Sequence, residues 1–207
     1  LCPFLLGVFV SGSLALDNSK ETSDIDLLVI TKKGRIFTAR FFLFLFLSFF
    51  KLYRKEKNKK GKICLNHFFS QDSLSFNFPS LYNAVFYFHL RPIIDRENVF
   101  EKFKNKNKWI GNYILFWEKR YKAPFFIKKK SLLASLLEKL LSGKLGDLVE
   151  KWLKMIQLKR KEKKYKNLPL RGRVILSDET IELHPFSRER EILEEFEKRF
   201  EKIKRLL

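Results

Sequence analysis

Short apolar runs alternate with polar stretches over the first part of the chain, a pattern typical of an α/β domain. Residues 5–10 (LLGVFV) predict a short buried strand that ends in a Ser-Gly-Ser turn. The polar residues 17–23 predict a loop, although a helix beginning at Ser13 is an alternative for the start of this connection. Aliphatic and β-branched residues predict a second strand over 24–31 and a third over 63–69.

The most apolar part of the chain is the segment 36–53. Its uninterrupted apolar run lies between Arg40 and Lys51 and is too short for a bilayer-spanning helix, which needs about 20 apolar residues. We expect a buried helix here. A helix lying on a membrane surface is the alternative, because the basic residues 51–62 beside it suit anionic lipid. Residues 54–62 are expected to form a solvated loop.

The remaining chain reads mainly as helix. Ser80 is expected to cap a helix over 81–90, and Asp95 to open another over 97–105. An aromatic-rich helix follows, with these large side chains: Trp109, Tyr113, Phe116 and Trp117. Apolar residues then recur at helical spacing over 132–158.

Breaks and charge runs divide this helical part further. Gly143 and Gly146 predict a break into two helices, and the charge run 159–166 predicts a loop or a fraying helix end. Residues 173–184 predict a hairpin. A last amphipathic helix carries apolar residues at helical spacing: Ile192, Leu193, Phe196, Phe200 and Ile203.

These elements predict an α/β (α+β) fold in two regions. A core over 1–75 contains the three strands, and a mainly helical region over 76–207 contains the hairpin near 173–184. Because the chain opens on Leu1 rather than Met, we expect that an N-terminal piece is missing.

The net charge is +20 and is spread unevenly. Residues 1–50 carry five basic and four acidic side chains, 51–130 carry nineteen and six, and 131–207 carry nineteen and thirteen. A basic surface suits RNA or DNA. The chain is also rich in phenylalanine, with 23 residues, and a joint excess of lysine and phenylalanine is what an AT-rich genome produces without any such partner. Charge alone therefore names no ligand, and nothing in the sequence indicates the oligomeric state.

Several classes of protein are disfavoured. Cys2 and Cys64 form neither a disulfide framework nor a CxxC clip, so they read as reduced thiols of a cytoplasmic protein. His89 and His184 lack the partner spacing of a zinc site. The sequence has no signal peptide, no P-loop, no Rossmann glycine motif and no nucleophile elbow.

Two acidic residues one position apart open the second predicted strand. Asp24 and Asp26 should project from the same face, because side chains alternate along a strand. Two neighbouring carboxylates repel each other unless a cation lies between them, and Mg²⁺ held jointly with substrate phosphates fits hard oxygen ligands. Upstream, the Gly12-Ser13 turn can bring backbone N–H groups close to an anion. The alternative to a metal site is that the strand simply begins at the end of a polar loop, with Asp26 paired to a lysine.

The combination resembles the nucleotidyltransferase superfamily typified by DNA polymerase beta. The residues that carry the resemblance are Gly12-Ser13 and, eleven residues after Gly12, Asp24-Ile25-Asp26, within the segment 7–31. The resemblance implies a small mixed sheet with helices, Mg²⁺ on Asp24 and Asp26, and a nucleoside triphosphate on Gly12 and Ser13. An acceptor hydroxyl would attack the α-phosphate and release pyrophosphate.

One position departs from the family pattern. A third acidic residue is usual on a later strand of the same sheet, where the third predicted strand offers Asn66. Asn66 can ligate a metal through its carbonyl oxygen but is a poor general base. Asp72 could substitute if the strand end curls back, whereas His67 should point to the opposite side and pack. The departure allows a slow enzyme, an acceptor that needs no strong base, or an inactive module that binds nucleic acid. The acceptor itself is not indicated.

Overall fold

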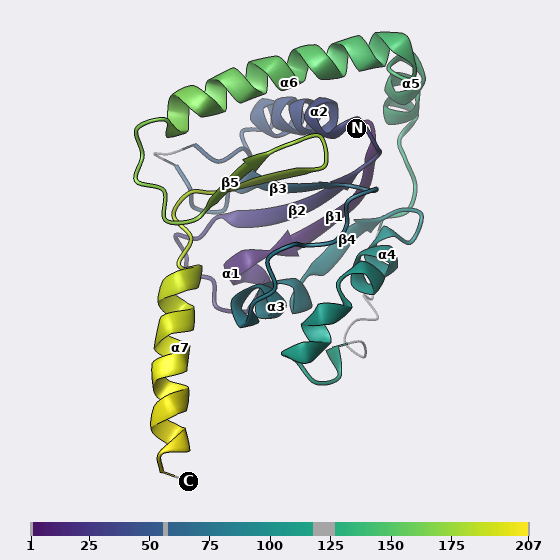
Figure 1. Ribbon diagram of the computed structural model, residues 1–207. Helices are drawn as coiled ribbons and strands as arrows, with labels where there is room; N and C mark the ends of the chain where they lie inside the picture. Colours follow the sequence, from purple (N-terminus) through teal and green to yellow (C-terminus); the bar gives the residue numbers. More distant parts are fainter. Residues whose placement is uncertain (1, 56–57, 118–126, 207) are drawn as a thin grey trace.

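The protein is described by a computed structural model that covers residues 2–55, 58–117 and 127–206. Residues 56 and 57 of the predicted basic loop therefore lie outside the described part. The six described strands are β1 (Leu5–Ser11), β2 (Ile25–Thr31), β3 (Ile63–Ser70), β4 (Arg91–Asp95), β5 (Arg173–Leu176) and β6 (Thr180–His184). They form one mixed sheet in the order β4-β1-β2-β3-β6-β5 (Figure 1).

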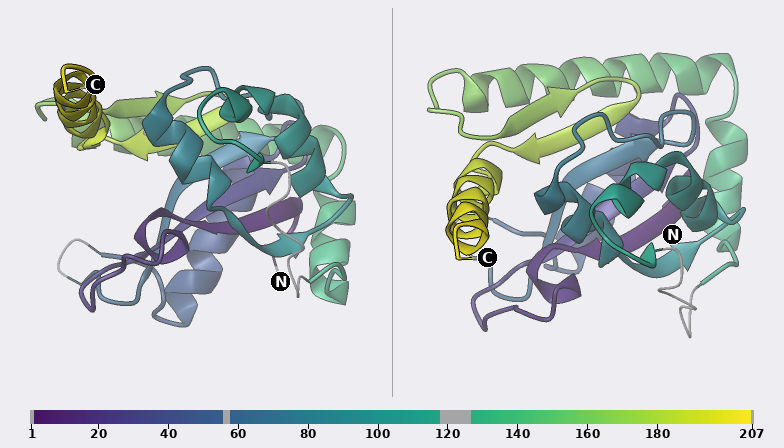
Figure 2. Two further views of the ribbon diagram at one scale, coloured as in Figure 1. Left: turned by 90° about the horizontal axis from the view of Figure 1, so that it is seen from below. Right: turned by 60° about the horizontal axis from the view of Figure 1, so that its bottom comes forward.

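Helices cover both faces of this sheet (Figures 1 and 2). They are α1 (Gly12–Ala15), α2 (Ile36–Phe49), α3 (Leu81–Phe88), α4 (Val99–Lys106), the 3-10 helix η1 (Lys108–Asn112), α5 (Leu132–Leu140), α6 (Lys144–Tyr165) and α7 (Glu189–Lys204). Side chains of alternate strand residues point to opposite faces of the sheet and belong to two hydrophobic cores. Leu27 and Val29 of β2 pack on the side of α2 and α6, while Leu28 and Ile30 pack on the side of α3, α4 and η1. The predicted α/β class with a small mixed sheet is confirmed.

The connection from β2 through α2 to β3 determines where the polar residues meet. β2 and β3 are parallel, so both strands begin at the same edge of the sheet. β1 runs antiparallel to β2 and ends at that edge, with Ser11 opposite Asp26. The Gly12-Ser13 turn, Asp24 and Asp26, and the beginning of β3 are thereby gathered in one place.

The C-terminal half contributes to the same sheet. β6 pairs antiparallel with β3 only over His67–Phe69, and β5 pairs with β6 as the predicted hairpin. Ile63, at the start of β3, bridges to Tyr53. Between these two pairings, Cys64, Leu65 and Asn66 have no strand partner on that side among the described residues. The division at residue 75 stays a prediction, and the sheet takes strands from both sides of it.

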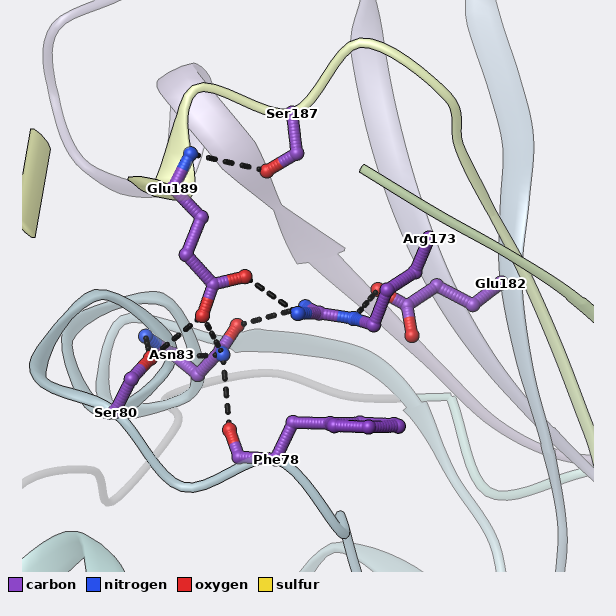
Figure 3. Close-up of polar contacts among 7 residues, drawn as sticks. All are labelled: Phe78, Ser80, Asn83, Arg173, Glu182, Ser187 and Glu189. Atoms are coloured by element: carbon purple, nitrogen blue, oxygen red, sulfur yellow. Dashed lines mark hydrogen bonds and ion pairs between the residues drawn. The ribbon is translucent and has the colours of Figure 1, made fainter. Parts of the chain in front are cut away.

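Two carboxylates attach the later helices to this framework. Glu150 of α6 accepts hydrogen bonds from the backbone N–H groups of Phe37 (2.9 Å) and Thr38 (2.8 Å), in the first turn of α2. These N–H groups have no partner within their own helix, so a buried carboxylate suits them. Glu189, at the start of α7, makes a 2.5 Å ion pair with Arg173, which also pairs with Glu182 of β6 at 2.9 Å (Figure 3).

Three expectations from the sequence need correction. The helix expected over 36–53 ends at Phe49, and its last part is exposed: Phe49 retains 81% of its accessible surface. Of the two alternatives for the charge run 159–166, the loop is wrong, because the run forms the end of α6, which continues to Tyr165. The residues between Leu90 and Asp95, expected to separate two helices, form the edge strand β4. None of the helices in the described ranges is both long and apolar enough to cross a membrane.

Candidate functional site

Asp24 and Asp26 lie together at the beginning of β2. Asp24 immediately precedes the strand and Asp26 is its second residue. Cys64 of β3 is the residue paired with Asp26 in the parallel register. One oxygen of each carboxylate and the Cys64 sulfur all lie within 4.8 Å of one another. The two acids therefore share one face, as the strand periodicity predicts, and a thiol lies beside them.

Gly12 brings the preceding turn directly against Asp26. Its φ of +66° is a conformation that residues with a Cβ rarely adopt. A Cβ at this position would lie only 2.4 Å from the Asp26 Oδ2 atom, so the close approach also requires glycine. Ser13 follows in the four-residue helix α1, and its carbonyl accepts a 3.0 Å hydrogen bond from the Asn18 N–H. The predicted phosphate turn and the predicted metal ligands are thus adjacent.

A Gly12→Ala substitution should separate the two reasons for this glycine. We expect it to destabilise the fold by about 1–3 kcal/mol, since it adds a positive-φ penalty and a clash with Asp26. The matched control is Gly34→Ala, because Gly34 has a similar φ of +62° but nothing within 4 Å of an added Cβ. Urea denaturation of both variants measures the difference. Equal destabilisation would mean that the contact with Asp26 contributes nothing.

Asn66 contacts Asp26 from the neighbouring strand. Its side-chain N–H donates a 3.1 Å hydrogen bond to Asp26 Oδ1. β3 contains one extra residue here, because Asp26 pairs with Cys64 whereas Leu28 pairs with His67. Such a bulge redirects a side chain locally. Asn66 is buried, and its carbonyl oxygen has no hydrogen-bond partner among the described residues, which leaves one oxygen available to a ligand.

Cys64 and Arg54 complete the surroundings of the two aspartates, and sequence reasoning assigned neither to the site. The Arg54 guanidinium lies 2.7 Å from Asp24 Oδ2 and 3.2 Å from the Cys64 sulfur. The sequence predicts an ordinary thiol for Cys64, and for Arg54 it favours a solvated position over one that lines a phosphate cleft. The available signal was position: Cys64 lies two residues before Asn66, on the same predicted strand. Arg54 supplies a positive charge to Asp24, whereas Asp26 has no ion pair with a described residue.

The pKa values of Asp26 and Cys64 reflect their burial at a place where Asp26 has no ion pair with a described residue. Burial, together with repulsion from Asp24, raises the pKa of Asp26 to about 6, although the Asn66 hydrogen bond and Arg54 oppose the shift. Burial and the charge of Asp26 raise the pKa of the Cys64 thiol to about 11. A divalent cation would relieve the repulsion, because it favours the ionised form of both carboxylates. The donor set of two carboxylates and a free amide oxygen fits such an ion.

The other two candidates, Asp72 and His67, have different surroundings. Asp72 follows β3 at the far end of the parallel strands, where it pairs with Lys33 at 2.8 Å. It therefore does not replace a third carboxylate, because β3 runs away from the site instead of curling back. His67 is buried among the rings of Phe69, Phe76 and Tyr87, so it packs as expected.

A cavity of about 710 Å³ opens beside the aspartates, on their β3 side. Its near wall includes Asp24, Asp26 and Asn66, and its far wall comes from α6 and from residues 182–188, which follow one another through the end of β6 into the turn before α7. The ion pairs of Arg173 in Figure 3 hold this far wall in place. The edge of the sheet that carries Asp24, Asp26 and Asn66 thus borders an open cavity.

Comparison with protein families gives a match in the first part of the chain. Residues 3–68 match the family model described as a nucleotidyltransferase domain. The matched segment contains β1, β2 and most of β3, with the Gly12-Ser13 turn and both aspartates. The search of curated proteins and the search of solved structures gave no match. The resemblance inferred from the spacing of these residues is therefore confirmed.

Proposed function

We propose that the protein is a Mg²⁺-dependent nucleotidyltransferase, because residues 3–68 match the family model of a nucleotidyltransferase domain. It would transfer a nucleoside monophosphate from a nucleoside triphosphate to an acceptor hydroxyl and release pyrophosphate. The observation that carries the proposal is the gathering of Asp24, Asp26 and the Gly12 turn at one edge of the sheet. Binding of Mg²⁺ and of the triphosphate are parts of the proposal.

Each residue has a distinct role in this proposal. Asp24 and Asp26 would hold Mg²⁺, which supplies charge neutralisation at the transferring phosphate and at the attacking oxygen. Gly12 and Ser13 would hold the triphosphate through backbone N–H groups, since no Cβ stands in the way at Gly12. Asn66 fixes the orientation of Asp26 through its hydrogen bond. Arg54 would share Asp24 with the ion or move aside.

Among the described residues, no third carboxylate joins Asp24 and Asp26, because Glu182 of the same cavity pairs with Arg173. This points to slow turnover. Among the described residues around Asp26, the neighbours on β3 are Asn66 and Cys64. An amide is not a base, and a thiol with a pKa of about 11 stays protonated at neutral pH. We therefore expect the acceptor hydroxyl to be one that ionises readily or transfers its proton to solvent.

Pyrophosphate release tests the function. With Mg²⁺ and a mixture of RNA, protein and small-molecule hydroxyl acceptors, the parent protein should release pyrophosphate from a nucleoside triphosphate, and EDTA should stop this release. Asp24→Asn and Asp26→Asn should each lower the rate by about 10³-fold or more. Asp72→Asn is the matched control, because this exposed carboxylate pairs with Lys33 at the other end of β3. Equal rates in all three variants would refute the assignment of the aspartates.

The second candidate is a nucleotidyltransferase-fold module that binds nucleic acid without turnover. It is favoured by the basic excess of residues 51–130 and by the Arg54–Asp24 ion pair, which places a side-chain cation where an ion would bind. A plot of log affinity for RNA against log salt concentration tests it. A phosphate-binding surface gives a steep negative slope, and a flat line would exclude this candidate.

A further inference from the structure

The cavity beside the aspartates lies on the side away from the triphosphate turn. Gly12 and Ser13 belong to the β1–β2 side of Asp26 and do not line the cavity, whereas Asn66 and the unpaired stretch of β3 do. Most of the remaining wall comes from residues 161–188, beyond the segment that matches the nucleotidyltransferase domain. The cavity is therefore placed to receive the second substrate, the acceptor, with its hydroxyl directed at Asp24 and Asp26.

The lining of the cavity is strongly basic. Among the described residues, it contains seven lysine and arginine side chains and three carboxylates. Two of these carboxylates already have cationic partners within the wall, Asp24 with Arg54 and Glu182 with Arg173. Arg188 pairs with Glu191 outside the lining, so the excess positive charge of the lining comes from its lysines. This charge favours an anionic occupant over a polycationic one.

Lys161 is the basic residue most clearly lacking a counter-ion. It belongs to α6 and lines the cavity, and no carboxylate of the described residues lies within ion-pair distance of its ammonium group. Its nitrogen lies 5.6 Å from the centre of the Tyr165 ring. Burial, with repulsion from Arg40 and Lys164, lowers the pKa of Lys161 to about 8. A bound phosphate would compensate this charge.

Aromatic side chains stand among these cations. Tyr82 and Phe86 of α3 line one part of the cavity, and Phe186 and Tyr165 line others. Phe186 is 58% exposed although it lies in this wall. Exposed ring faces beside cations are the combination that binds a nucleobase together with its phosphate.

We propose that this cavity is the acceptor site and that the acceptor is a phosphate-bearing nucleotide, either free or at the end of an RNA strand. The inference rests on the proposed function and names its second substrate. The phosphate lies against Lys161, the base lies on the aromatic wall, and a ribose hydroxyl faces Asp24 and Asp26. The charge of the cavity disfavours polycationic acceptors such as aminoglycosides.

A binding measurement that needs no turnover tests this. The protein is saturated with Mg²⁺ and the α,β-methylene analogue of ATP, which occupies the donor site without reacting. It is then titrated calorimetrically with AMP, with a 5′-phosphorylated ten-nucleotide RNA, with adenosine and with neamine. We expect AMP, the RNA or both to bind, and adenosine and neamine to bind at least about tenfold more weakly. Binding of AMP would indicate a free nucleotide as the acceptor, and binding of the RNA would indicate the end of an RNA strand.

Lys161→Met provides the matched variant, because methionine retains an apolar stem. It should weaken binding of the phosphorylated probe at least about tenfold and change the affinity for the methylene analogue by less than about twofold. Lys163→Met, on the exposed face of the same helix and outside the cavity wall, should change neither.

Three results would overturn the proposal: tight binding of neamine, no binding of either phosphorylated probe, or equal weakening of donor and acceptor probes by Lys161→Met. The last result would assign Lys161 to the donor triphosphate. Failure of the proposed function itself would appear separately, as absence of Mg²⁺-dependent pyrophosphate release.

Discussion

The Asp26→Asn variant is expected to be more stable than the parent protein at pH 7.5 in the presence of EDTA. Asp26 is buried beside Asp24, which raises its pKa from 3.8 to about 6. Keeping this side chain ionised therefore costs folding free energy. Since one pKa unit corresponds to about 1.4 kcal/mol, the gain on removing the charge should be about 1–3 kcal/mol. Asparagine retains an oxygen that accepts the Asn66 hydrogen bond.

The pH dependence has a definite sign. Between the unfolded pKa of 3.8 and the folded pKa of about 6, the folded protein binds more protons at Asp26 than the unfolded protein does. The contribution of Asp26 to stability therefore falls as the pH rises through this window, and the full cost is present above it. The difference in the free energy of unfolding between Asp26→Asn and the parent should grow from pH 4 to pH 7, as urea denaturation at each pH would measure.

A divalent metal ion should reverse the order of stability, so that the parent protein becomes more stable than Asp26→Asn. Mg²⁺ or Mn²⁺ binds the folded parent and stabilises it, whereas Asp26→Asn lacks one ligand and gains less. A parent that is more stable than Asp26→Asn in EDTA at neutral pH would contradict the repulsion inferred between the two aspartates. Asp26→Asn would thus be more stable without metal but less able to bind it. Such a trade-off is common where a functional site holds charges that repel each other.

The second large effect is expected from Arg173→Met. Arg173 pairs with Glu182 and Glu189, and its guanidinium lies 5.3 Å from the Phe76 ring centre and 5.0 Å from that of Phe78. Removing it leaves two carboxylates uncompensated, one of them fully buried in β6. We expect a loss of about 3–5 kcal/mol in the free energy of unfolding.

The control for Arg173→Met is Arg171→Met. Arg171 lies two residues earlier, is exposed and approaches Glu191 only to 4.0 Å, so its loss should cost less than about 1 kcal/mol. Chemical denaturation measures both variants. Similar small losses would show that the network in Figure 3 does not hold β5, β6 and α7 against α3.

The local part of the site could be predicted because strand periodicity determines it. Asp24 and Asp26 are two positions apart on a strand, so their shared face follows from the sequence alone. Their closeness to Gly12 needed the antiparallel pairing of β1 with β2, which the short polar connection suggests. The match of residues 3–68 to a nucleotidyltransferase domain agrees with this local pattern.

The rest of the site depends on tertiary register, which no local pattern encodes. Cys64 lies opposite Asp26 only because β3 pairs in parallel, and the bulge beside it directs Asn66 to the same carboxylate. The far wall of the cavity comes from residues that lie more than 90 positions after Asn66 in the sequence. β4 escaped prediction because Pro92 interrupts it. As an edge strand, β4 tolerates a residue without an N–H donor.

The charge pattern left the secondary structure open in one place. The run 159–166 predicts a loop or a fraying helix end, and the structure shows the last part of α6, which extends to Tyr165. Lysine and arginine are good helix formers, and cations near a helix C-terminus interact favourably with its dipole. The same extension brings Lys161 and Tyr165 to the cavity.

The most direct test of the account is the binding of Mn²⁺ followed by electron paramagnetic resonance, since the sharp signal of free Mn²⁺ disappears on binding. The parent protein should remove the signal at a stoichiometry of at least one ion per chain, and more tightly when a nucleoside triphosphate is present. A variant carrying both Asp24→Asn and Asp26→Asn should leave the signal unchanged. Undiminished Mn²⁺ binding by that variant would contradict the claim that these two carboxylates hold the ion.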